Sequence, residues 1–122
     1  MIPVQGMKFF NVTPPAAIVD NTSFTTNEID TLGWDYCTII CQLGATDIAM
    51  AAQKVQESDT SGSGHADITG ATFAGALPSA TNDDGLFAFY LDLRKRKRYL
   101  DLVATAGDGA AGTFMSALAI LS

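Results

Sequence analysis

The sequence predicts an all-β domain, an antiparallel β-sandwich of about eight short strands, with a jelly roll as the candidate topology. Turn-forming Gly, Thr, Ser, Asn and Asp residues interrupt the chain about every ten to fifteen residues. The segments between them are short and rich in β-branched and aromatic residues, and in several of them every second residue is apolar. With 122 residues, 48% of them apolar, we expect a single domain over residues 1–122, in which 1–15 are a candidate N-terminal arm.

The N-terminal region offers two strands and one helical turn. Met7–Val12 is a candidate strand that we expect to stop at Pro14 and Pro15, because proline cannot donate a ladder hydrogen bond. A second strand is expected over Ala16–Val19. Residues 26–32 resemble a single helical turn, with a threonine cap at the start and a glycine directly after the end.

The central region contains the clearest strand, Trp34–Leu43. Its alternation predicts one face made of Cys37, Ile39, Cys41 and Leu43 and another made of Trp34, Tyr36 and Ile40.

The next segments give a weaker signal. Ile48–Glu57 favours a strand, but its apolar residues also fit a helical stripe, so an open sheet with a helix over Ile48–Val55 is the alternative fold. His65–Phe73 offers weak edge strands separated by Gly70.

Three further strands are expected toward the C-terminus. Leu86–Leu93 has an apolar face of alternating residues, and Arg98–Ala106 alternates in the same way. The short basic link between these two segments favours a hairpin. Thr113–Leu121 is the last predicted strand.

Cys37 and Cys41 are the two cysteines of the chain. Four residues of a strand span about 13 Å, which exceeds the roughly 7 Å that a disulfide bridges between Cα atoms. We therefore expect buried free thiols, as suits a reducing compartment. The first residues lack the features of a secretory signal, and we expect no membrane-spanning segment.

The charge distribution singles out one basic segment. The net charge is −6, yet five of the seven Lys and Arg residues are consecutive: Arg94, Lys95, Arg96, Lys97 and Arg98. This basic pentad is either a solvated turn, a docking point for an acidic surface of a partner or a neighbouring copy, or, with the least support, a nucleic-acid contact. We expect no nucleic-acid partner.

Apolar residues on both faces of some strands suggest that the sandwich has surface left to cover. Trp34, Tyr36 and Ile40 form one such set, and Met115, Ala117 and Ala119 form another. Because a two-sheet sandwich buries one face of each sheet, the surplus is either covered by loops or contributes to a homo-oligomer.

The sequence offers no catalytic or metal-binding signature. Its one histidine, His65, lies in a Ser/Gly-rich segment where we expect an exposed loop residue, without the base and nucleophile of a triad. Cysteine and histidine spacing does not match a zinc site, and the glycines do not form a phosphate-binding motif. We therefore expect neither a cofactor nor a metal, and no enzymatic activity.

Three segments, Ile48–Gly64, Asp67–Gly70 and Arg98–Gly107, resemble the head decoration, or cement, proteins of tailed bacteriophages. The resemblance covers about residues 20–122 and includes no residue-specific functional motif. It implies a β-sandwich or jelly roll that binds the outside of the assembled capsid, often as a trimer, and bridges subunits of the major capsid protein. It also implies a place on the virion surface after assembly in the host cytoplasm.

The partner-binding candidates are the basic pentad, Trp34 and Tyr36. The alternative function is a carbohydrate- or receptor-binding β-module, like those of head fibres or adhesins, in which Trp34, Tyr36, Tyr90 or Tyr99 would stack on a ligand. An exposed Trp34 would favour this alternative, and a Trp34 packed in the core would count against it.

Overall fold

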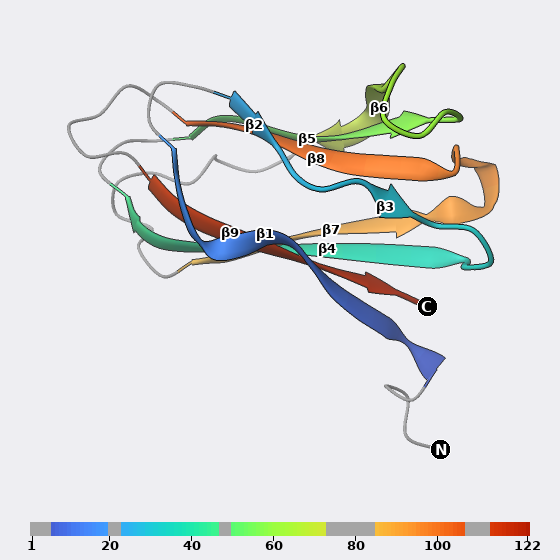
Figure 1. The fold of residues 1–122 in the computed structure, drawn as a ribbon, viewed down its shortest axis with the longest axis horizontal. Coiled ribbons are helices and arrows are strands. Elements are labelled where there is room, and N and C mark those ends of the chain that lie inside the picture. The colour runs from blue at the N-terminus through green and yellow to red at the C-terminus, as the bar shows by residue number, and fades with distance from the viewer. Residues whose placement is uncertain (1–5, 20–22, 47–49, 73–84, 107–112) are drawn as a thin grey trace.

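The computed structural model describes residues 6–19, 23–46, 50–72, 85–106 and 113–122. Most of them are in antiparallel β-strands, as Figure 1 shows, which confirms the predicted all-β class. The strands are β1 (Lys8–Val19), β2 (Ser23–Thr25), β3 (Ile29–Asp30), β4 (Tyr36–Thr46), β5 (Met50–Ser58), β6 (Ala66–Thr72), β7 (Leu86–Asp92), β8 (Tyr99–Ala106) and β9 (Thr113–Leu121).

The strands form two sheets that lie one above the other (Figure 1). Sheet A has the order β1-β9-β4-β7, and sheet B has the order β2-β8-β5-β6, with β3 also pairing with β8. The pairings are nested: β1 pairs with β9, β2 and β3 with β8, β4 with β7, and β5 with β6. Such nesting across two sheets is the topology of a jelly roll.

Alternating apolar residues from both sheets build the core between them. In β4, Cys37, Ile39, Cys41 and Leu43 are all buried, as predicted. The same alternation continues in β7, β8 and β9, where every second residue packs inward. Their buried members are Phe89, Leu100, Leu102, Ala104, Met115, Ala117, Ala119 and Leu121.

The ambiguous segment after β4 is a strand, because β5 pairs on both sides, with β6 and β8. Val55 is fully buried in the core. This confirms the sandwich over the alternative with a helix. Burial raises the pKa of both Cys37 and Cys41 to about 12, so these free thiols are packed as small apolar side chains.

The predicted strand break at Pro14 and Pro15 is wrong. β1 runs through both prolines, with register shifts against β9 between Asn11 and Thr13 and between Thr13 and Ala17. Proline is tolerated here because β1 is an edge strand, where a missing N–H need not interrupt a ladder. Residues 8–15 of the candidate N-terminal arm thus belong to sheet A.

The predicted helical turn at 26–32 is also wrong, because residues 26–31 are bonded at several points to β8 and to Arg98 before it, and the chain turns only at Leu32. Thr26 donates its backbone N–H to the carbonyl of Leu102, 2.9 Å away, and its Oγ1 accepts the N–H of Leu102 at 3.0 Å. Ile29 then pairs with Leu100 as β3. Thr26, which resembled a helix cap in the sequence, instead makes two hydrogen bonds to the backbone of Leu102 in β8.

The basic link does not close a hairpin, because β7 lies in sheet A and β8 in sheet B. Residues 93–98 cross from one sheet to the other, beginning with a 3-10 turn over Leu93–Lys95. The weak strands expected on either side of Gly70 form one strand, β6, in which Gly70 adopts a positive φ of 85°. In the described parts of the chain, no helix is long and apolar enough to cross a membrane.

Candidate functional site

The outward side of sheet A carries a row of apolar side chains, which we call the sheet-A outer face. Side chains alternate between the two faces of a strand. Because Cys37, Ile39, Phe89 and Ala119 point into the core, the residues next to them in sequence point to the outer face. The strand register places these neighbours side by side. The face comprises Phe9, Asn11, Tyr36, Thr38, Ile40, Gln42, Leu86, Ala88, Tyr90, Asp92, Ser116, Leu118 and Ile120.

Exposed apolar area is concentrated on this face. Among the described residues, five large apolar side chains are exposed, and four of them belong to the sheet-A outer face: Tyr90 (81% exposed), Leu86 (65%), Phe9 (49%) and Tyr36 (49%). The fifth, Leu32 (67%), lies in the turn after β3. Several exposed large apolar side chains gathered on one side of an acidic protein suggest a surface for another macromolecule.

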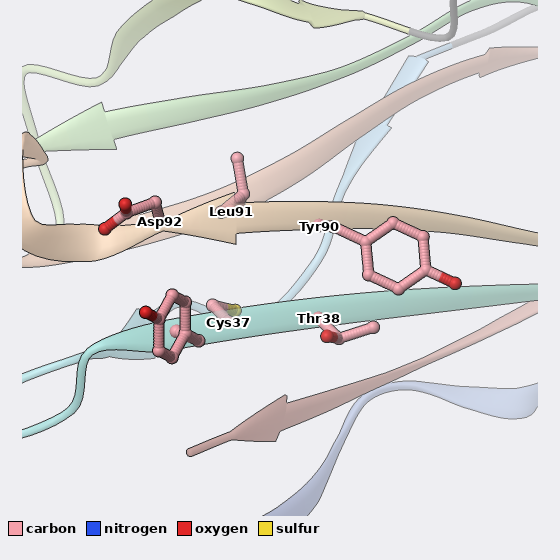
Figure 2. A pocket seen from close by; sticks show the side chains of 6 residues that line it. Cys37, Thr38, Tyr90, Leu91 and Asp92 are labelled. Atoms are coloured by element: carbon pink, nitrogen blue, oxygen red, sulfur yellow. The ribbon is translucent and has the colours of Figure 1, made fainter.

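The face is hollowed at the end where β4 begins and β7 ends. The hollow has a volume of about 410 Å³ and is lined by Tyr36, Thr38, Tyr90 and Asp92, together with Cys37 and Leu91 beneath. Tyr90 lies directly opposite Thr38 in the register, and Figure 2 shows its ring beside Thr38 with Asp92 further along β7. A second hollow of about 500 Å³ adjoins it at Asp92 and is lined by Arg94, Lys95 and Arg96.

The two aromatic residues predicted as partner-binding candidates occupy different environments. Tyr36 is exposed on the sheet-A outer face. Trp34 precedes β4 and is partly buried against the hydrophobic core, so the assignment of Trp34 to the same face as Tyr36 is wrong. Its backbone N–H donates to the carbonyl of Thr31 across the turn at Gly33.

The basic pentad is exposed, but carboxylates of the same chain partner most of it. Arg94 pairs with Asp92 at 2.5 Å, Arg96 with Glu57 at 3.5 Å, and Lys97 with Asp59 at 3.9 Å. Arg98 makes two parallel hydrogen bonds of 2.8 Å to Asp30. Among the described residues, Lys95 has no such partner, so the pentad presents far less free positive charge than its sequence suggests.

These ion pairs also shift the pKa of the acids. The hydrogen bond from Arg98 lowers the pKa of Asp30 to about 2, and the one from Arg94 lowers that of Asp92 to about 2. Both carboxylates therefore stay charged well below neutral pH. Their role is to hold the crossing link against β3 and the end of β7.

The outward side of sheet B carries a polar cluster around His65. The imidazole Nε2 lies 3.2 Å from Glu28 Oε2 and 3.6 Å from Asp101 Oδ2, and the side chain is 14% exposed. The expectation of an exposed loop histidine is therefore wrong, because Glu28 and β8 hold the loop down.

Glu28 also accepts hydrogen bonds from Ser61 Oγ and from the N–H of Gly62, which lowers its pKa, while burial raises the pKa of Asp101. Within the described residues, no group of three or more His, Cys, Asp and Glu side chains is arranged to hold a metal ion. The hydroxyl of Ser61 bonds to Glu28 and not to the imidazole, so the cluster joins a loop to sheet B.

Tyr36 was predicted from the sequence as a partner-binding candidate and Tyr90 only as a stacking residue of the alternative function, whereas Phe9 and Leu86 were not predicted. A signal for Leu86 was present, because the alternating apolar face of Leu86–Leu93 contains Phe87 and Phe89, which places Leu86, Ala88 and Tyr90 on the opposite side of the strand. What the sequence could not show is that β1, β9, β4 and β7 are neighbours, which gathers these residues on one surface.

No family model and no curated protein matches this chain. Among solved structures, the SPBc2 prophage-derived protein YomS is similar with a TM-score of 0.53 and 11% identity, over 94% of this chain and 91% of that one. The chitosan-binding module 1 of a chitosanase/glucanase from Paenibacillus sp. IK-5 has a TM-score of 0.45 and 10% identity, over 92% and 75%.

A family GH115 4-O-methyl-α-glucuronidase with specificity for decorated arabinogalactans has a TM-score of 0.44 and 12% identity, over 91% of this chain and 16% of that one. At these identities the first similarity establishes a shared fold. This chain is a β-sandwich with the fold of a prophage-derived protein.

Proposed function

We propose that this protein is a structural component of a phage particle that binds the outer surface of the capsid and bridges subunits of the major capsid protein, without enzymatic activity. The observation that carries the proposal is the sheet-A outer face. On it, Tyr90 and Leu86 are mostly exposed, and Phe9 and Tyr36 are about half exposed. Its place would be the virion surface, reached after assembly in the host cytoplasm.

Two further observations support the proposal. Three segments of the sequence resemble head decoration proteins, and the same β-sandwich fold occurs in a prophage-derived protein. The resemblance supplies the capsid as partner, and the sheet-A outer face supplies a surface suited to it.

The physical role is reinforcement by many small interfaces. The side chains of the sheet-A outer face are carried by paired strands, so this face can cover a subunit boundary with little loss of backbone conformational entropy on binding. Each copy adds a modest interface, and a partner that binds the assembled shell but not its dissociated subunits stabilises the shell by mass action.

The test is co-sedimentation of the purified protein with phage heads that lack it. The double variant Leu86→Ser with Tyr90→Ser should lower occupancy at least about tenfold, because both side chains are exposed on the sheet-A outer face. Leu32→Ser is the matched control, since Leu32 is as exposed as Leu86 but lies elsewhere, and it should leave occupancy unchanged.

Salt dependence tests the contribution of the basic pentad. Because Arg94, Arg96, Lys97 and Arg98 are paired within the chain, attachment should change little between low and physiological salt. Occupancy that is unaffected by the double variant but lost when the pentad is replaced by Ser would overturn the sheet-A assignment.

A second candidate function is carbohydrate binding in the hollow at Tyr36 and Tyr90. The rings of Tyr36 and Tyr90 line this hollow together with the hydroxyl of Thr38 and the carboxylate of Asp92. Aromatic rings beside polar groups of this kind suit a sugar ligand. The packing of Trp34 against the core removes one expected stacking residue. Titration with soluble oligosaccharides, followed by tyrosine fluorescence and repeated with Tyr36→Ala, separates this candidate from capsid binding.

A further inference from the structure

The four sheet edges of the sandwich, formed by β1, by β7, by β2 with β3, and by β6, differ in how far they are protected against pairing with another strand. β1 contains two prolines and two register shifts. β2 and β3 are three and two residues long and are separated along β8. β6 has a register shift against β5 and a glycine at positive φ. Such interruptions are the means by which proteins prevent edge-to-edge association.

β7 has none of these interruptions. Leu86–Asp92 pairs with β4 over seven consecutive residues without a shift, and it contains no proline, glycine or basic residue. In the described part of the chain, β4 is the strand that pairs with it, which leaves its other side open. An unbroken apolar edge of this length is a template for a further strand.

The open side exposes a defined set of backbone groups. Leu43 donates its N–H to the carbonyl of Gly85, and Leu93 donates to that of Asp35, so the odd-numbered residues of β7 are hydrogen-bonded to β4. The N–H and C=O groups that point away from β4 therefore belong to Leu86, Ala88, Tyr90 and Asp92.

We infer that β7 pairs antiparallel with β7 of a second copy of this chain, about a two-fold axis at Phe89, to form one continuous eight-stranded sheet. This register uses all seven residues, because Leu86 then faces Asp92 of the partner strand and Ala88 faces Tyr90 of the partner strand. Each of these pairs consists of residues whose backbone groups point to the open edge.

The strand is self-complementary on its inward side, which is what selects a second copy as the occupant. Under the two-fold axis, Phe89 meets Phe89 and Phe87 meets Leu91, so every inward pair is apolar. Phe87 and Leu91 are only partly buried at the rim of the core, and the second copy would extend the core over them. The pairing also joins two sheet-A outer faces into one surface.

The first test is the mass of the purified chain in solution by sedimentation, from about 1 µM to about 1 mM, a range that covers a modest interface. We expect a concentration-dependent shift from 12.8 kDa to twice that mass. A single-chain mass throughout, or a three-chain mass, would contradict the two-fold pairing, and neither outcome bears on capsid binding.

The matched variants are Ala88→Pro and Ala88→Val. Proline removes an edge N–H and adds bulk there while leaving the hydrogen bonds to β4 intact, so it should weaken dimerisation about tenfold or more. Valine keeps the N–H at the same outward position and should dimerise like the wild type. Equal dimerisation of both variants would place the contact elsewhere.

Amide hydrogen exchange tests the same pairing without a substitution. Protection at Leu86, Ala88, Tyr90 and Asp92 should rise with protein concentration, whereas the amides bonded to β4 should be protected at every concentration. This alternating pattern is specific to a new strand at the edge. Concentration-independent exchange at the four residues would overturn the inference even if Ala88→Pro failed to fold.

Discussion

The outer faces of the two sheets have opposite chemistry although the strands behind them pack against the same core. On sheet B, the outward side chains bond to one another: Asp67 accepts hydrogen bonds from Lys54 Nζ at 3.0 Å and Gln56 Nε2 at 2.6 Å, and His65 lies between Glu28 and Asp101. On sheet A, Tyr90 and Leu86 are exposed and apolar.

The difference shows where a partner belongs. The outward side of sheet B carries charged side chains, among them the pairs of Lys54 with Asp67 and of His65 with Glu28, so covering it with a partner would bury charges. Sheet A presents apolar area whose removal from water is favourable at about 25 cal/mol per Å². Substitutions on the inner face of sheet A should therefore lower the stability of the fold, whereas substitutions on its outer face should lower the affinity for a partner.

The largest effect on stability is expected inside sheet A. Ile39→Ala should lower the free energy of unfolding by about 2 to 5 kcal/mol, because Ile39 is fully buried and its loss leaves a cavity. Ile40→Ala, one position along on the outer face, should cost about 1 kcal/mol or less. Chemical denaturation of both variants measures the contrast, and equal losses would contradict the assignment of inner and outer faces.

The next largest effect on stability is expected at Thr26, which joins the segment between β2 and β3 to β8 of sheet B. Thr26→Val should cost about 1 to 3 kcal/mol, because the buried N–H of Leu102 loses the Oγ1 acceptor. Thr26→Ser keeps an acceptor and should retain most of the stability. Thermal melts of the pair decide the matter: a Val variant as stable as the Ser variant would show that this hydrogen bond is dispensable.

A smaller and pH-dependent effect is expected at the pair of Asp30 and Arg98. The pKa of Asp30 in the folded state, about 2, lies below its ordinary value of 3.8, so the pair stabilises the fold above 3.8 and loses this contribution as the pH falls toward 2. Both side chains are nearly half exposed, so solvent screens the pair and its contribution at neutral pH should be small.

Asp30→Asn and Arg98→Gln should each flatten this acid-range decline, measured as the free energy of unfolding against pH. A wild-type slope that persists in both variants would assign the decline to other carboxylates.

The smallest effect on stability should accompany Tyr90→Ser, within about 0.5 kcal/mol, because Tyr90 is 81% exposed. The same variant should weaken attachment to phage heads, so stability and binding separate at this position. A Tyr90 variant that loses more than about 2 kcal/mol would show that the ring is part of the packing.

Sequence alternation was sufficient to predict β4, β7, β8 and β9, because in each of them burial depends on a period of two that the residues themselves display. It failed where a distant strand decides the outcome. Residues 26–32 have the local signals of a helical turn, yet residues 26–31 are bonded to β8 and to Arg98 instead. Pro14 and Pro15 would stop an inner strand, but β1 is at an edge.

The same limit applies to the candidate site. The basic pentad was conspicuous as a run of charges, but apart from Asp92 the acids that partner it lie far away in sequence: Asp30 is 68 positions from Arg98, and Glu57 is 40 positions from Lys97. Tyr36 and Tyr90 lie in strands that are separated in sequence by β5 and β6, and the pairing of β4 with β7 brings them to the same hollow.

The position of β9 has a consequence for biosynthesis. β9 lies between β1 and β4, and its inward residues complete the core. Until residues 113–121 have left the ribosome, β1 therefore lacks its partner in sheet A and β4 is paired only on the side of β7. A nascent chain would hold the earlier strands with their apolar sides uncovered during this interval. Closure of the roll must therefore follow translation of this last strand, and slow release at that point would favour aggregation.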